Sequence, residues 1–136
     1  MTDNSENRKH DVFFYGLYMD PDILKSVGVK PNNPRIGYVE NYKLRIGNKA
    51  TLLRAPGEKA NGVVYSLSHS DINKLYWDAG LKEYVSEALL AKIGTEAIPV
   101  LCCNLLVPPN ESESNQAYAE KLKVSMNKLG IAWNMD

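Results

Sequence analysis

Residues 11–24 read DVFFYGLYMDPDIL, and this stretch predicts a strand that leads directly into a helix. Residues 11–15 are aromatic and β-prone, and Gly16 ends them. Asp20 is a suitable N-cap for the helix that follows, and Pro21 fits the first position of that helix. A strand-to-helix junction is therefore expected near the start of the chain.

The junction is the first candidate binding site. Backbone amides between a strand and a helix have no partner in either element, so the amides of Gly16, Leu17 and Tyr18 suit a carboxylate or a developing oxyanion. Gly16 also allows a ligand to approach the backbone closely. A plain strand-to-helix turn would have the same composition and is the alternative.

Further along the chain, short strands are grouped between helices. Ser68 and Asp71 form a predicted capping box at the start of one helix, and Tyr118 and Trp133 are expected to dock the last helix on the core. Apolar spacing and turn residues predict strands at residues 35–46, 50–54, 61–67, 83–93 and 97–107, turns at 47–48 and 55–57, and helices at 20–28, 68–80 and 115–129. This order favours an α+β fold, with a small, largely antiparallel, barrel-like mixed sheet and flanking helices, over a doubly wound parallel sheet.

The composition indicates one ordinary globular domain. The chain has 136 residues, of which residues 1–10 are predicted to be a disordered leader and residues 11–136 a single domain. Sixteen basic side chains balance sixteen acidic ones, so nothing indicates a nucleic-acid or anionic-membrane partner. The longest apolar run, residues 100–107, is far shorter than the roughly 20 residues that span a bilayer. We therefore expect a soluble, cytoplasmic protein.

The two cysteines, Cys102 and Cys103, are adjacent. Neighbours in an extended segment point to opposite faces, which disfavours a disulfide between them. His10 and His69 are far apart in the sequence, so the chain has no zinc-ligand spacing. We expect two reduced, buried or half-buried thiols in a strand, in keeping with a cytoplasmic location.

A second candidate site lies at residues 75–84, LYWDAGLKEY, where a short helix gives way to a strand. A carboxylate beside aromatic surface can act as an acid or base, which makes Asp78 and Glu83 candidates. For both residues, a solvated loop carboxylate is the alternative. Tyr84 fits either a packed strand aromatic or a hydroxyl in the wall of a pocket.

Three stretches of the sequence resemble the γ-glutamylcyclotransferase-like family, which includes γ-glutamylamine cyclotransferases. FFYGLYMDPDIL resembles the Tyr-Gly-(Ser/Thr)-Leu-Met opening of that family. ATLLRAPGEKANGVVYSLSHSDINKL resembles its Pro-Gly turn, its Gly-Val-Leu-Tyr strand and the short helix that follows. AYAEKLKVSMNKLGI resembles the closing helix of many members. The resemblance spans residues 11–132.

The resemblance implies an α+β fold with a small barrel-like sheet and a cavity at its mouth. In active members of the family, backbone amides of the Tyr-Gly-Ser-Leu turn hold the γ-glutamyl group, and a glutamate takes a proton from the substrate α-amine. That amine attacks its own γ-carbonyl, which releases 5-oxoproline and an amine or amino acid. Because the ring closure is intramolecular, positioning supplies much of the rate, and no metal or organic cofactor is implied.

The resemblance assigns ligand-binding residues one by one. Tyr15 and Gly16 match the family motif. Leu17 stands where Ser or Thr is usual, and Tyr18 stands where a smaller residue is common. Backbone contacts survive both changes, although a hydroxyl is lost and bulk is added. Tyr84 matches the family tyrosine that opens the next strand.

The catalytic position departs from the family pattern. The family glutamate directly precedes the glycine at the helix end, and Ala79 occupies that position in this chain. Alanine cannot move a proton. Asp78, one residue earlier, is the candidate catalytic acid/base if the helix end shifts by one residue, and Glu83 is a second substitute.

These residues lead to one hypothesis and one alternative. The chain is predicted to be a γ-glutamylcyclotransferase-like protein that binds a small γ-glutamyl or amino-acid-like compound, with any release of 5-oxoproline depending on Asp78. The alternative is a catalytically inactive binding or interaction module on the same fold. A carboxylate in the pocket that faces the amides of residues 16–18 would favour the enzyme, whereas a pocket blocked by Tyr18, with both carboxylates in solvent, would favour the module.

Overall fold

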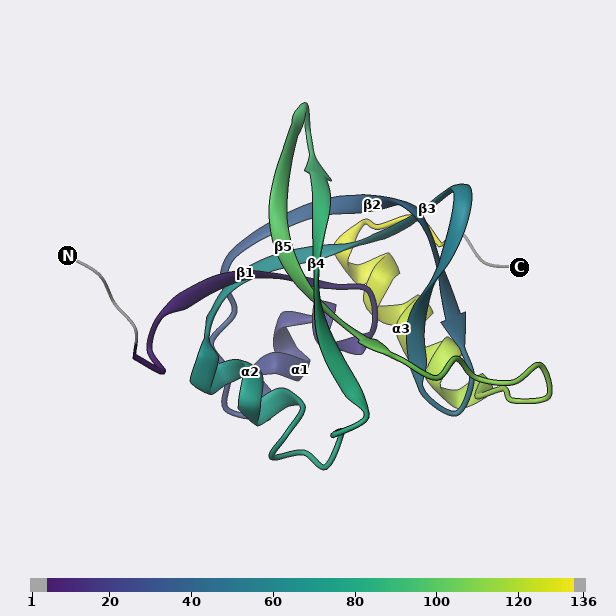
Figure 1. Cartoon of the computed structure of the whole chain (residues 1–136), viewed down its shortest axis with the longest axis horizontal. Helices are drawn as coiled ribbons and strands as arrows, with labels where there is room; N and C mark the ends of the chain where they lie inside the picture. The colour runs from purple at the N-terminus through teal and green to yellow at the C-terminus, as the bar shows by residue number, and fades with distance from the viewer. Residues whose placement is uncertain (1–4, 134–136) are drawn as a thin grey trace.

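A ring of five strands forms the centre of the structure, which is a computed structural model that describes residues 5–133 (Figure 1). The strands are β1 (Lys9–Phe14), β2 (Asn32–Ile46), β3 (Ala50–Ser68), β4 (Tyr84–Ile93) and β5 (Glu96–Leu105). The helices are α1 (Pro21–Ser26), α2 (His69–Leu75) and α3 (Gln116–Leu129), and a short 3-10 turn, η1 (Leu17–Met19), precedes α1. None of these helices is long and apolar enough to cross a membrane. The predicted α+β class is confirmed.

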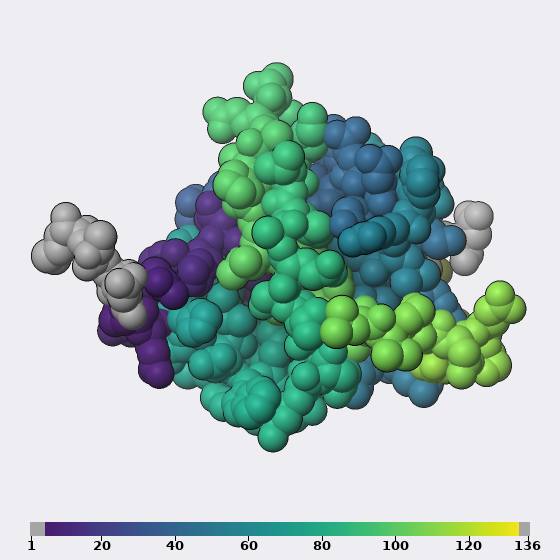
Figure 2. Space-filling view, viewed as in Figure 1, coloured from purple at the N-terminus to yellow at the C-terminus, as the bar shows by residue number. Residues whose placement is uncertain are grey.

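The strands follow one another around the ring in the order β1-β3-β2-β4-β5, and β5 closes the ring against β1. Neighbouring strands are antiparallel except β1 and β5, which run parallel and pair at Val12 and Leu101. The outer part of the β4–β5 hairpin projects from the body of the molecule (Figure 2). Closure of the ring buries strand edges that would otherwise face solvent.

β3 is a single strand of 19 residues, which corrects the prediction of two strands separated by a turn at residues 55–57. The register with β2 is irregular here, because Glu40 pairs with Lys59 and Tyr42 with Arg54, which leaves residues 55–58 of β3 opposite a single residue of β2. Asn41, at the shift, has a left-handed φ of 66°, and its Oδ1 accepts a hydrogen bond of 3.1 Å from the Gly57 amide. A bulge of this kind bends both strands without ending them.

β1 begins earlier than the sequence predicts. Lys9 and His10, which belong to the predicted leader, pair with Ser68 and Leu67 of β3. Residues 1–4 of the leader lie outside the described residues. The first strand therefore starts two residues before its predicted position, beside the start of α2.

α2 begins as predicted and ends sooner. Ser68 and Asp71 form the predicted capping box. Tyr76 leaves the helical region, with φ of −120° and ψ of −65°, and its ring packs against Tyr18 and Tyr84 at centroid distances of 5.7 and 5.4 Å. The helical pattern that predicted residues 68–80 is therefore overridden by aromatic packing at its end.

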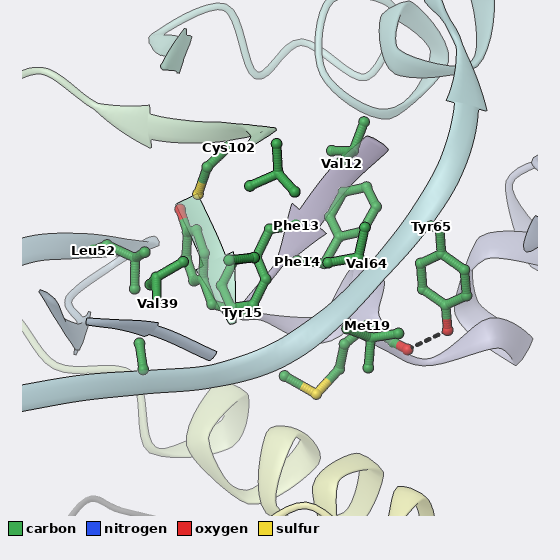
Figure 3. Close-up of a cluster of buried hydrophobic side chains, with 14 of the residues drawn as sticks. Val12, Phe13, Phe14, Tyr15, Met19, Val39, Leu52, Val64, Tyr65 and Cys102 are labelled. Atoms are coloured by element: carbon green, nitrogen blue, oxygen red, sulfur yellow. Dashed lines mark hydrogen bonds between the residues drawn. The ribbon is translucent and has the colours of Figure 1, made fainter. Parts of the chain in front are cut away.

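β1 is buried on both faces within the hydrophobic core (Figure 3). Val12, Phe13 and Phe14 expose 0%, 1% and 2% of their surface. Figure 3 also shows Tyr65 of β3 at the η1 segment, where its hydroxyl donates a hydrogen bond of 2.6 Å to the Met19 carbonyl. The core thus fixes the strand that enters the β1–α1 junction and the turn that leaves it.

A buried carboxylate ties α3 to the same junction. Asp20 caps α1 as predicted, by accepting the Asp22 amide at 3.0 Å. Lys128 of α3 forms ion pairs with Asp20 at 2.8 Å and with Asp22 at 3.1 Å, and the Ser125 hydroxyl donates to Asp20 at 2.8 Å. Burial acts to raise the pKa of Asp20, but the hydrogen bonds outweigh it and hold the pKa below its usual value.

Candidate functional site

A cavity of about 280 Å³ opens beside the β1–α1 junction. Four parts of the chain line it: the junction, the β2–β3 turn, the segment between α2 and β4, and α3. The lining residues are Phe14, Tyr15, Gly16, Leu17, Tyr18, Ile23, Asn48, Lys49, Ala50, Tyr76, Leu81, Tyr84 and Tyr118. A concave, mainly aromatic wall with a few polar groups is typical of a small-molecule site.

The junction contributes backbone amides to the cavity wall. The Leu17 amide donates a hydrogen bond of 3.1 Å to the Tyr118 hydroxyl. The Gly16 and Tyr18 amides have no hydrogen-bond partner among residues 5–133. The η1 turn fixes this segment, because the Met19 amide donates to the Gly16 carbonyl at 2.9 Å. Two residues that line the cavity therefore carry unpaired amide donors, on a backbone held by the η1 turn.

Gly16 and Tyr118 are in close contact. A Cβ atom at residue 16 would overlap the Tyr118 hydroxyl. The φ of Gly16 is −114°, which any residue can adopt, so glycine is needed at this position for space and not for backbone conformation. The missing side chain allows α3 to bring Tyr118 to the Leu17 amide.

Five tyrosines line the cavity as neutral hydroxyls. Burial raises the pKa of each, so none is ionised at neutral pH. Three of the hydroxyls are fixed by donating to backbone carbonyls: Tyr15 to Cys103 (2.6 Å), Tyr18 to Leu75 (2.8 Å) and Tyr84 to Ala50 (2.5 Å). These residues can shape a ligand site and donate hydrogen bonds, but they are poor bases.

Lys49 is the only charged residue among the described residues that line the cavity. It lies in the β2–β3 turn, and its amine forms an ion pair with Glu83, just before β4. The hydrogen bond from Lys49 lowers the pKa of Glu83. The two side chains are 46% and 43% exposed, so the pair lies at the mouth of the cavity, between its interior and solvent.

The five residues predicted to bind a ligand all lie around this one cavity. They are Tyr15, Gly16, Leu17, Tyr18 and Tyr84. The structure thus brings together residues from the β1–α1 junction and from the start of β4, which are far apart in the sequence. Their contact with a ligand stays a prediction.

The candidate catalytic residues lie elsewhere. Asp78 is exposed in the turns after α2, where its amide donates to the Asn73 carbonyl at 2.8 Å, and it is not among the lining residues. Ala79 is also exposed. Glu83 contacts Lys49 from outside the cavity wall. Within residues 5–133, no carboxylate lines the cavity.

Among the lining residues that the sequence did not predict, Tyr118 and Lys49 carry the groups most relevant to binding. The sequence predicts that Tyr118 docks the last helix, and it does pack against the core, but its hydroxyl also reaches the Leu17 amide. Lys49 directly follows the predicted turn at residues 47–48. Its position at the end of a hairpin is a usable signal, because hairpin ends of a closed sheet gather at the mouths of the ring.

Both tryptophans lie away from the cavity lining. Trp77 is 60% exposed, and the Lys82 amine lies 4.5 Å from its ring centroid. Trp133 follows α3, with the Lys123 amine 5.2 Å from its ring centroid. Five of the eight tyrosines therefore surround the cavity, whereas both tryptophans lie in other parts of the molecule.

Several solved structures share this architecture. A structure described as a gamma-glutamyl cyclotransferase aligns with a TM-score of 0.75 and 21% identity, over 90% of this chain and 81% of that chain. YkqA from Bacillus subtilis aligns with a TM-score of 0.75 and 21% identity over 89% of this chain, which spans only 49% of the YkqA chain. An uncharacterised human protein aligns with a TM-score of 0.74 and 19% identity, over 93% of this chain and 82% of that chain.

At these identities the likeness establishes the fold. The chain has the γ-glutamylcyclotransferase-like fold that its sequence motifs predicted. No protein-family model matches the sequence, and a search of curated proteins gives no significant match. Because one fold can carry several functions, the function has to be argued from the residues of the cavity.

Proposed function

We propose that the cavity binds a small γ-glutamyl or amino-acid-like compound. The observation that carries this proposal is that Gly16 and Tyr18 line the cavity and that their amides have no hydrogen-bond partner among residues 5–133. Unpaired amides at a strand-to-helix junction suit a carboxylate or a polarised carbonyl oxygen. The fold shared with a gamma-glutamyl cyclotransferase supports the same class of ligand.

The rest of the wall suits the other parts of such a compound. The tyrosine rings provide apolar surface for a short carbon chain. The Tyr118 hydroxyl accepts a hydrogen bond from the Leu17 amide, and its own proton has no acceptor among the described residues. This hydroxyl can therefore donate to a ligand oxygen beside the two free amides.

Binding without release of 5-oxoproline is the function that the cavity supports best. Cyclotransfer needs a base that takes a proton from the attacking amine. The lining residues described offer no carboxylate, and their tyrosines are neutral. Turnover that depends on Asp78 is the second candidate, because Asp78 lies only two residues beyond Tyr76, which lines the cavity.

Two measurements on the intact protein test this proposal. Isothermal titration calorimetry with γ-glutamylglycine should show saturable binding. An assay across γ-glutamyl amino acids, γ-glutamyl amines and glutathione should detect no 5-oxoproline. Release that falls by about a hundredfold or more in Asp78→Asn would replace this proposal with an enzyme that has a displaced base. If no compound of the panel binds, the proposal is overturned.

A restored acid provides a complementary prediction. Ala79→Glu places a carboxylate at the position where the family resemblance expects one. Ala79 itself is exposed and outside the cavity lining, so release of 5-oxoproline by this variant would show that a longer side chain at residue 79 reaches the ligand and that the proton acceptor is the missing group. Ala79→Gln is the matched control, since it adds the same bulk without a base. If both variants stay inactive while binding is retained, more than the base is missing.

A cytoplasmic location is part of the same proposal. Cys102 and Cys103 are both free thiols, and thiols persist in a reducing compartment. Fractionation of cells that express the intact chain would test this location.

A further inference from the structure

The cavity contains one charged side chain that has no role in the binding proposed above, which depends on the backbone amides. Lys49, the one charged lining residue among those described, lies in the β2–β3 turn, whereas the free amides belong to the β1–α1 junction. We propose that Lys49 binds a carboxylate on the part of the ligand that lies away from these amides. This inference rests on the proposed function, because it specifies which γ-glutamyl compounds the cavity prefers.

The turn that carries Lys49 is held in place from two sides. On one side, Glu113 of the loop after β5 accepts the Asn48 amide at 3.1 Å, and the Asn115 side chain donates to the Asn48 carbonyl at 3.3 Å. On the other side, the Tyr84 hydroxyl donates to the Ala50 carbonyl at 2.5 Å. The backbone around Lys49 is therefore preorganised, and only its side chain has to be ordered when a ligand binds.

Glu83 is the resident counter-ion that a ligand carboxylate would replace. The Lys49–Glu83 pair is nearly half exposed, and ion pairs with that much solvent around them add little stability. A ligand carboxylate inside the cavity meets the same amine where less water competes for it. Exchange of one carboxylate for another leaves Lys49 paired in both states, so the lysine is never left as an uncompensated charge.

This arrangement selects a chemical class. In this proposal the γ-glutamyl group lies at the amides of residues 16–18, and the group joined to its γ-carbonyl lies at Lys49, which lines the same cavity. A γ-glutamyl amino acid carries a free carboxylate on that group, whereas a γ-glutamyl amine carries a neutral or cationic one. The single positive charge of the wall favours the first and disfavours the second. The inferred ligands are therefore γ-glutamyl peptides with a free terminal carboxylate.

A matched pair of ligands tests the inference. γ-Glutamylglycine and γ-glutamylglycinamide differ only in the charge of the terminal group, and calorimetry gives the dissociation constant of each. We expect the unmodified protein to prefer γ-glutamylglycine, and Lys49→Met to remove that preference by weakening this ligand about fivefold to tenfold. Lys49→Arg should retain it. Lys82→Met is the control, because Lys82 lies on Trp77 outside the cavity and its loss changes the net charge equally.

The outcomes separate this inference from the function on which it rests. Equal affinity of the unmodified protein for both ligands would overturn the inference and leave the proposed function standing. Equal weakening of both ligands by Lys49→Met would also overturn it, because Lys49 would then contact the shared glutamyl part. If neither ligand binds, the proposed function fails and the inference with it. Glu83→Gln should strengthen γ-glutamylglycine alone, and weakening of that ligand would contradict the exchange of counter-ions.

Discussion

At the scale of single residues, Gly16 and Tyr118 are the pair whose contact shapes the cavity. Gly16→Ala would press a methyl group against the Tyr118 hydroxyl, and overpacking of this kind costs about 1–3 kcal/mol. In the Tyr118→Phe background, the nearest remaining ring atom, Cζ, is at 3.6 Å from that methyl group, an ordinary contact. We therefore expect Gly16→Ala to lower the free energy of unfolding in both backgrounds. The loss should be smaller in Tyr118→Phe than in the unmodified protein, with a difference of about 1 kcal/mol between the two losses. Urea denaturation of the four proteins measures this coupling, and strict additivity would contradict it.

Asp20 gives the folded state a dependence on acidic pH. Its pKa is lower in the folded chain than in the unfolded chain. Its stabilising contribution is therefore complete above the unfolded pKa of about 3.9 and is lost as pH falls through the lower folded pKa. Asp20→Asn retains a good N-cap but loses the charge that pairs with Lys128. We expect this variant to be about 1–2 kcal/mol less stable at neutral pH, with a difference that shrinks below about pH 3.

Denaturant titrations at neutral and acidic pH measure the Asp20 effect. Asp22→Asn is a suitable control, because the Asp22 side chain contacts the same lysine but is 72% exposed. A stability loss in Asp20→Asn that is the same at both pH values would show that the charge of Asp20 is not responsible.

The sequence predicted the residues of the site unevenly, for a physical reason. Tyr15, Gly16, Leu17 and Tyr18 are contiguous, so a local motif identifies them together. Lys49 joins them only because the sheet closes into a ring, which brings distant turns to one cavity. A local pattern places Lys49 at the end of a hairpin, but it does not show that this hairpin end lies beside residues 15–18.

At the scale of elements, the β2–β3 turn depends on the loop that follows β5. Glu113 uses both carboxylate oxygens there, accepting the Asn48 amide at 3.1 Å and the Asn110 amide at 3.0 Å. We expect Glu113→Ala to speed hydrogen exchange at the Asn48 amide by about fivefold or more, because that amide loses its acceptor. Exchange measured by NMR tests this, and Glu111→Ala in the same loop should leave Asn48 unchanged. If the Asn48 amide exchanges at the same rate in both variants, the hydrogen bond to Glu113 does not hold the β2–β3 turn.

The strands and helices show where sequence patterns succeed and where they fail. The start of α2 was predicted because a capping box is local, and its hydrogen bonds are present. The continuity of β3 through residues 55–57 was not predicted, since Gly57 is held by the Asn41 side chain of a different strand. Tyr76 ends α2 early because its ring packs on Tyr18, which lies far away in the sequence. A local signal thus identified the start of α2, and tertiary contacts decided the extent of α2 and of β3.

At the scale of the whole molecule, the two cysteines report on global unfolding. Cys102 and Cys103 are neighbours in β5, and both are buried, with 0% and 4% exposure. Burial raises the pKa of both thiols, which suppresses the reactive thiolate. We expect a thiol reagent to leave the native protein unmodified and to label both cysteines together across the urea transition seen by circular dichroism. Ser112→Cys, on an exposed loop, should react at once.

Early labelling of one cysteine, before the circular dichroism transition, would contradict this cooperative behaviour. It would show that β5 separates from the ring while the rest of the sheet stays folded. The parallel contact of β5 with β1 at Val12 and Leu101 is the place where such an opening would start, because only this pair of residues closes the ring there.

The division of the aromatic residues also has an optical consequence. Five of the eight tyrosines line the cavity, while Trp77 and Trp133 lie outside it. Selective excitation of tryptophan therefore reports on the surroundings of α2 and α3, and the near-ultraviolet absorption of tyrosine includes the cavity. The unlabelled protein thus carries two sets of chromophores. Tyrosine absorption can follow the binding of a ligand in the cavity, and tryptophan fluorescence can follow changes around α2 and α3 in the same sample.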